Sequence, residues 1–123
     1  MQTLAAVVCI LITVSLGEAT SLTHYLRVKQ TGTAQEKMQM GMYIFGMGRG
    51  FFWANAFLEH TKQPPMYCSP PQLTLTQDNY LRFLDDATVR LKEEMRLVGG
   101  QDQDILGYLL LDELRRVFPC KAP

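Results

Sequence analysis

Histidine, cysteine and tryptophan are scarce in this 123-residue chain, and neither sign of charge is in excess. Lys and Arg together number 12, as do Asp and Glu, so the charge balance does not favour nucleic acid or an anionic membrane surface as a partner. The two histidines, His24 and His60, have no second histidine or cysteine at metal-ligand spacing. A G-x-S-x-G nucleophile turn and a phosphate-binding glycine loop are also absent. We therefore expect no enzyme, no cofactor and no metal site.

Alternating apolar and polar residues, the pattern typical of strands, do not extend far enough anywhere in the chain to predict one. The length allows one domain, and a hydrophobic content of 47% is typical of a globular protein. Helical spacing of apolar residues recurs along most of the sequence. The predicted fold class is therefore all-α, a single small domain of about four helices.

An apolar run near the amino end, residues 4–16, is shorter than the ~20 residues needed to span a bilayer and is typical of a signal peptide. Gly17 and Ala19 are small residues at the positions that signal peptidase requires before a cut at Thr20. No Lys or Arg precedes the run, which is atypical. We interpret residues 1–19 as a signal peptide and residues 20–123 as the mature domain; a buried first helix is the alternative.

Signal removal would leave two cysteines, Cys68 and Cys120, in an oxidising compartment. An even count there predicts one disulfide, which would close a loop of about 50 residues and stabilise the fold by ~4 kcal/mol. Two free thiols or an intermolecular bridge are the alternatives. Cys68 lies within residues 63–71, a proline-rich segment that predicts an extended connection, and Cys120 follows Pro119, which ends the last helix.

Four segments carry the helical pattern. The first is residues 21–29 with Ser21 as a cap, and the second is the glycine-containing stretch 34–60. The third begins at the N-cap Thr74 with Gln77 as its capping-box partner. Its apolar face is predicted to be core, and consists of Tyr80, Leu84, Ala87, Leu91, Met95 and Val98. The apolar face of the fourth consists of Leu106, Leu110, Leu114 and Val117.

Charged residues follow the same periodicity on the outer faces. On the third segment they alternate in sign every four residues, at Asp78, Arg82, Asp86, Arg90 and Glu94. This alternation favours a solvated ladder of ion pairs over acid–base catalysis. Asp112 and Arg116 are predicted to form a similar outer pair on the fourth segment.

Glycine inside a helix costs about 1 kcal/mol relative to alanine, so the glycines of the second segment need a reason. Gly46, Gly50 and Ala54 recur every four residues and predict a ridge of small side chains where another helix packs closely, within the chain or across a dimer. Four methionines of this segment could suggest Cu(I) ligation, but helical spacing puts Met38 and Met42 nearly opposite Met40 and Met47. Adaptable core filling is the favoured interpretation.

Three stretches in this order, GMYIFGMGRG, YCSPPQLTLTQ and LLLDELRRVFPC, resemble the Rap/Tai-type family of small exported immunity proteins. Members of that family protect against peptidoglycan amidases delivered by type VI secretion. The resemblance extends over about residues 21–120. The chain departs from the family pattern where Val28, Gln30 and Met40 replace a further cysteine pair, and where RLVGGQDQD replaces a short turn containing His-Pro.

The resemblance implies a non-enzymatic inhibitor in the periplasm of a Gram-negative bacterium, often a homodimer, that binds an amidase and occludes its active site. We expect the residues that contact the amidase to lie in an acidic loop with glycines at its hinge. This loop could enter the amidase cleft that holds a catalytic histidine. This loop consists of Gly99, Gly100, Gln101, Asp102, Gln103 and Asp104. A plain connection between two helices is the alternative for the loop. The alternatives for the whole chain are an acid-stress-type periplasmic chaperone and another non-enzymatic envelope role.

Overall fold

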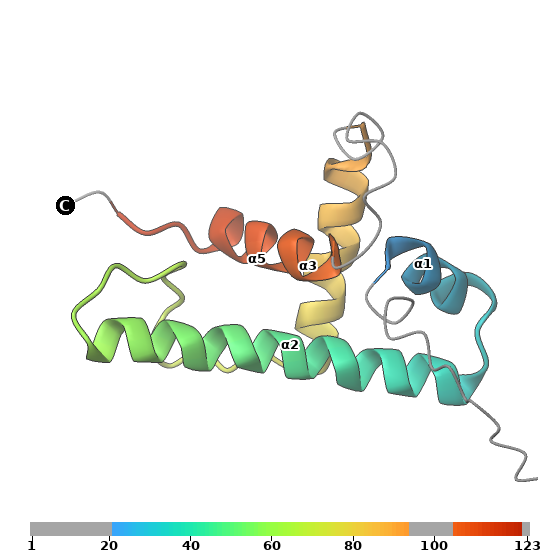
Figure 1. The fold of residues 1–123 in the computed structure, drawn as a ribbon, viewed down its shortest axis with the longest axis horizontal. Helices are drawn as coiled ribbons and strands as arrows, with labels where there is room; N and C mark the ends of the chain where they lie inside the picture. Colours follow the sequence, from blue (N-terminus) through green and yellow to red (C-terminus); the bar gives the residue numbers. More distant parts are fainter. Residues whose placement is uncertain (1–20, 94–104, 122–123) are drawn as a thin grey trace, which may run out of the picture.

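The computed structural model describes residues 21–93 and 105–121, which form an all-α domain (Figure 1). Its helices are α1 (Leu22–Thr31), α2 (Ala34–His60), α3 (Gln77–Arg90) and α5 (Ile105–Val117). No strand occurs in these two ranges. The predicted class, a single small domain of four helices, is confirmed. The expected signal peptide at 1–19 lies outside the described residues.

Side-chain caps fix where the first three helices begin. Ser21 caps α1 as predicted, accepting a hydrogen bond from the backbone N–H of His24 at 3.1 Å. The N-cap of α3 is Thr76 rather than Thr74, and Asn79 rather than Gln77 completes the capping box. The helix starts two residues later than predicted because Leu75 is buried from the extended segment before it. A cap at Thr74 would place Leu75 in the first helical turn instead.

Residues 61–76, here called the strap, turn back after α2 and lead to the start of α3 (Figure 1). The predicted disulfide joins Cys68 in the strap to Cys120 beyond α5, with 4.9 Å between the Cα atoms. The Cys68 N–H also donates to the Phe118 carbonyl oxygen at 2.9 Å. Phe118 in turn packs edge-on against Phe83 of α3, with the ring centroids 6.0 Å apart. The strap and the chain end are therefore fixed to one another and to α3.

Asn55 of α2 holds the same strap from its other side. Its side-chain amide donates to the carbonyl oxygen of Tyr67 and its side-chain oxygen accepts from the N–H of Met66, both at 2.6 Å. Asn55 is buried, and both of its polar groups are satisfied. The Tyr67 side chain is buried as well. The beginning of the strap is hydrogen-bonded to the last turn of α2, and Asn55 binds its middle to the same helix.

The core lies where α3 packs against both α2 and α5, and α1 closes one end of it (Figure 1). The predicted core faces are largely confirmed. Tyr80, Leu84, Ala87 and Leu91 are buried on α3, as are Leu106, Leu110 and Leu114 on α5. Val117 is half-buried, because α5 ends there and the chain turns toward the strap. Met95 and Val98 lie outside the described residues.

The glycines that allow close helix packing are Gly41 and Gly48. A Cβ atom at Gly48 would lie 2.5 Å from the ring of Tyr80, and one at Gly41 would lie 2.3 Å from the Gln77 side chain. Both contacts bring the beginning of α3 against α2. The close approach of α3 therefore explains why these two positions are glycine. The four-residue spacing of Gly46, Gly50 and Ala54 did not indicate this contact.

The predicted ladder is wrong for the described residues Asp78, Arg82, Asp86 and Arg90, which form no ion pairs with one another along α3, and the predicted pair of Asp112 with Arg116 is wrong too. Arg90 binds Asp112 and Glu113 of α5, and Arg116 binds Glu113. The two pairs of Arg90 join α3 to α5, which pack side by side, whereas the pair of Arg116 with Glu113 lies within α5 at i, i+3 spacing. Glu94 lies outside the described residues.

We predict that Gly48→Ala lowers the free energy of unfolding by about 1–2 kcal/mol, because the added methyl group overpacks against the buried Tyr80 ring. The matched control is Gly46→Ala. Gly46 is exposed with no described atom within 4 Å of its Cβ position, so alanine should raise the free energy of unfolding by up to about 1 kcal/mol. Urea denaturation measures both. Equal effects of the two substitutions would contradict the proposed contact.

Replacing both Cys68 and Cys120 by alanine should lower the free energy of unfolding by ~4 kcal/mol, because the unfolded chain is then no longer closed into a large loop. Urea denaturation with and without dithiothreitol measures the effect. The reductant should destabilise the wild type by the same amount and leave the double variant unchanged. A wild type that is insensitive to reductant would show that the bond adds nothing to stability.

Candidate functional site

The residues predicted to contact a partner or a neighbouring helix form two groups, and the structure describes only one of them. The six residues Gly99, Gly100, Gln101, Asp102, Gln103 and Asp104 lie outside the described residues. Gly46, Gly50 and Ala54 do form one ridge along α2, and all three are exposed. Among the described residues, nothing lies within 4 Å of a Cβ position at Gly46 or Gly50. This ridge therefore has no helix of the described chain packed on it, and packing across a dimer stays a prediction.

Large apolar side chains border this ridge on the solvent side of α2. Met42, Trp53 and Phe57 are 62%, 63% and 65% exposed. Helical spacing places them on the same side of the helix as the ridge. We call the six residues the α2 outer face: Met42, Gly46, Gly50, Trp53, Ala54 and Phe57. Met38 and Tyr43 of α2 are exposed next to Met42, whereas the exposed Val89 of α3 lies apart from this face.

An arginine and a recess extend the α2 outer face to one side. The Arg49 guanidinium lies over the rings of Phe52 and Trp53, at 4.5 and 5.9 Å from their centroids. Beside it is a cavity of about 200 Å³ between α2 and the strap, lined by Arg49, Phe52, Tyr67 and Leu73 among others. Tryptophan, arginine and other aromatic residues around a recess are the composition of energetically dominant contacts between proteins.

The four methionines of α2 divide between two sides of the helix, as predicted. Met40 is buried and Met47 is half-buried against the core, whereas Met38 and Met42 are exposed. Their sulfur atoms therefore do not converge on one point. Within the described ranges, no three histidine, cysteine, aspartate or glutamate side chains are placed to hold a metal ion.

Glu113 of α5 is the one fully buried carboxylate among the described residues. Arg116 Nη2 lies 2.5 Å from Oε1, and Arg90 Nη2 lies 2.8 Å from Oε2. Hydrogen bonds from Arg116 and then from Arg90 hold the pKa of Glu113 below its usual range, against the opposing effect of burial. Hydrogen bonds to Asp112 and Glu113 raise the pKa of Arg90.

This charge cluster is suited to holding helices together rather than to proton transfer. A general acid or base near neutral pH needs a pKa near 7, and the pKa of Glu113 is shifted in the opposite direction. Both of its oxygens are occupied by arginines. Of the described helices, none combines the length and the apolar character needed to cross a bilayer. The exposed aromatic side chains and the neighbouring recess make the α2 outer face the strongest candidate for a functional surface.

Three important residues escaped prediction from sequence. Asn55 lies seven residues after Gly48, which is a helical repeat on the buried side of α2, and this spacing could have revealed it. Glu113 lies seven residues after the buried Leu106 in the same way. Trp53 lies within the apolar stretch 34–60, for which the sequence predicted a ridge of small residues but no exposed aromatic side chains. No local pattern indicated that one side of this stretch would be left in solvent.

Comparisons of the chain with known protein families, with curated proteins and with solved structures find no match. A functional proposal therefore depends on the geometry of the α2 outer face and on the resemblance carried by the three sequence stretches.

The lowered pKa of Glu113 predicts how stability depends on pH. A carboxylate whose pKa is lower in the folded chain stabilises the fold above its unfolded pKa of ~4.3, and the contribution is lost as the pH falls through the folded value. Glu113→Gln should therefore be less stable than the wild type at pH 7, and the difference should shrink as the pH falls below ~4. Urea midpoints between pH 7 and pH 2 measure it.

The matched control for this experiment is Glu59→Gln, because Glu59 is an exposed carboxylate at the end of α2. Its urea midpoints should follow those of the wild type at every pH. A gap between Glu113→Gln and the wild type that stays constant over the whole range would show that Glu113 does not titrate with a lowered pKa.

Proposed function

We propose that this chain is a non-enzymatic binding protein of the exported helical type, and that its partner is a peptidoglycan amidase whose active site it occludes. The observation that carries the proposal is the α2 outer face. It presents Trp53, Phe57 and Met42 to solvent on the longest helix of the domain. Contiguous exposed apolar surface of this kind marks interaction sites in soluble proteins.

The way α2 is held supports a role in binding. Its first turn is bound to α1 through Glu36, which accepts from Arg27 at 2.8 Å, and its middle packs on Tyr80 of α3. Near its end, Asn55 binds the strap. A helix fixed at three points along its length loses little conformational freedom when a partner binds, so more of the contact energy remains as affinity.

The amidase is proposed from the resemblance to Rap/Tai-type immunity proteins, and so is the periplasm as the place of action. An inhibitor of this type performs no chemistry of its own. It needs a stiff body with a surface that fits the mouth of the partner's cleft. The aromatic side chains of the α2 outer face, with the Arg49 recess beside them, are suited to such a contact. The loop at residues 99–104 stays a second predicted contact.

An acid-stress chaperone is the second candidate, and Glu113 is the observation that favours it. Protonation of this buried carboxylate would break its bonds to Arg90 and Arg116 and loosen α5 from α3. Apolar surface would then become exposed in acid. Fluorescence of an apolar dye during acidification distinguishes the candidates: a chaperone should bind the dye sharply in acid and suppress aggregation of a client, whereas an inhibitor should do neither while it stays folded.

We predict that the double substitution Trp53→Ala and Phe57→Ala weakens binding of a partner amidase, isolated by co-purification with the wild type, by about 100-fold or more, because truncation of a central aromatic contact typically costs ≥ ~2 kcal/mol. Thermal stability should change little, since both side chains are largely exposed. Calorimetric titration measures the affinity, and release of peptidoglycan fragments measures the inhibition.

Val89→Ala is the matched control, because Val89 is exposed on α3, away from the α2 outer face. It should bind and inhibit as the wild type does. Sedimentation of the same variants tests the other use of the face. A double variant that loses a dimer but keeps full inhibition would assign the α2 outer face to self-association and contradict its role in binding the amidase.

A further inference from the structure

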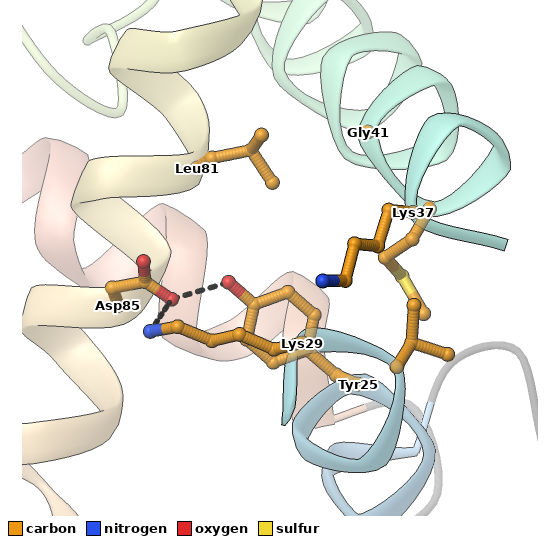
Figure 2. A pocket seen from close by; sticks show the side chains of 8 residues that line it. Tyr25, Lys29, Lys37, Gly41, Leu81 and Asp85 are labelled. Atoms are coloured by element: carbon orange, nitrogen blue, oxygen red, sulfur yellow. Dashed lines mark hydrogen bonds and ion pairs between the residues drawn. The ribbon is translucent and has the colours of Figure 1, made fainter. Parts of the chain in front are cut away.

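A second cavity, of about 210 Å³, lies between α1, α2 and α3, near the amino-terminal end of α2 (Figure 2). Val28, Met40 and Leu81, one from each helix, provide apolar walls. Gly41 also lines the cavity, and the Gln77 side chain occupies the space beside its backbone. An apolar cavity of ~150 Å³ is large enough to hold benzene, so this one has room for about eight non-hydrogen atoms.

The polar groups around this cavity differ in what they already bind. Asp85 Oδ1 accepts hydrogen bonds from the Tyr25 hydroxyl and from Lys29 Nζ, the latter at 2.8 Å. Burial, followed by the hydrogen bond to Asp85, raises the pKa of Tyr25, so its hydroxyl stays a donor. Asp85 is therefore engaged with α1 and closes one side of the cavity.

Lys37 is the other lysine that lines the cavity. Its side chain reaches from the first turns of α2 toward Tyr25, across the cavity (Figure 2). Its amine forms no ion pair with any residue in the described ranges, whereas Lys29 is paired with Asp85. Two ammonium groups and one carboxylate thus line the cavity, which leaves a net positive charge beside apolar walls.

We propose that this cavity binds a small apolar monocarboxylate, with the carboxylate on Lys37 Nζ and the hydrocarbon part among Val28, Met40 and Leu81. Charge complementarity selects the anion, because the one acidic group of the cavity is already paired. The apolar walls require a hydrocarbon body, and the volume limits the part of the ligand inside the cavity to about eight non-hydrogen atoms, so an eight-carbon acid places its carboxylate at the mouth, on the exposed Lys37. The proposal goes beyond the binding of a protein partner and does not depend on the α2 outer face.

The test is a titration of the ¹⁵N-labelled protein, residues 20–123, followed by two-dimensional NMR with sodium octanoate, 1-octanol and octylammonium chloride as probes. Octanoate should shift the amide signals of Val28, Met40 and Leu81. We expect 1-octanol to bind about 10-fold more weakly, because it lacks the charged hydrogen bond to Lys37, and octylammonium to bind more weakly still.

Two variants locate the two halves of the site. Lys37→Met keeps the stem and removes the charge, so it should weaken octanoate about 10-fold and leave 1-octanol unchanged. The matched control, Lys62→Met, removes a lysine beyond the far end of α2 and should change neither. Leu81→Phe fills the cavity and should abolish binding of both probes, while the circular dichroism spectrum stays that of the wild type.

Two results would overturn the proposal. Equal affinity for octanoate in the wild type and in Lys37→Met would show that the ammonium does not bind the carboxylate. Shifts confined to Trp53 and Phe57 would place the probes on the α2 outer face as an adventitious apolar contact. The inhibition assay tests the proposed function separately. A protein that inhibits the amidase but does not bind octanoate would contradict the proposed carboxylate site and leave the proposed inhibition of the amidase standing.

Discussion

The bond between Cys68 and Cys120 joins two segments that have no helical hydrogen bonds of their own, the strap and the chain beyond α5. The rest of the structure depends on this constraint. Once the strap is tied to the chain end and bound by Asn55, α3 begins where Tyr80 meets Gly48. That contact sets how α3 crosses α2, and α5 then packs on α3 to complete the core.

The arrangement also leaves one side of α2 in solvent. The core covers the side that contains Gly48 and Asn55, and the described residues provide no further helix to cover the opposite side. A helix that is apolar all round normally lies inside a large core. Here the domain is too small for that, so Trp53 and Phe57 stay exposed. A small domain buries a smaller fraction of its surface and therefore relies on a disulfide for stability. Its small size also leaves one side of α2 exposed as a surface for a partner.

Charged residues have different roles on two sides of α3, the side facing α5 and the side facing α1. Between α3 and α5, Glu113 is buried and both oxygens are bound by arginines, so the cluster holds helices together. Between α1 and α3, Asp85 is only partly buried and has one lysine partner. Nearby, Lys37 is left with its charge facing an apolar cavity. A fully paired cluster adds stability alone, whereas an unpaired charge beside apolar walls can recognise a ligand.

The sequence by itself determined the described helices and the core faces of α3 and α5, because helical periodicity is a local signal. It also indicated the pairing of Cys68 with Cys120, once the third cysteine, Cys9, is set aside as part of the predicted signal peptide. It did not determine that Gly48 rather than Gly46 lies under another helix, or that Arg90 pairs with Glu113. Only the tertiary structure decided these points, because they depend on which side of each helix a neighbour covers. The exposure of Trp53 and the cavity beside Lys37 follow from that same choice of neighbours.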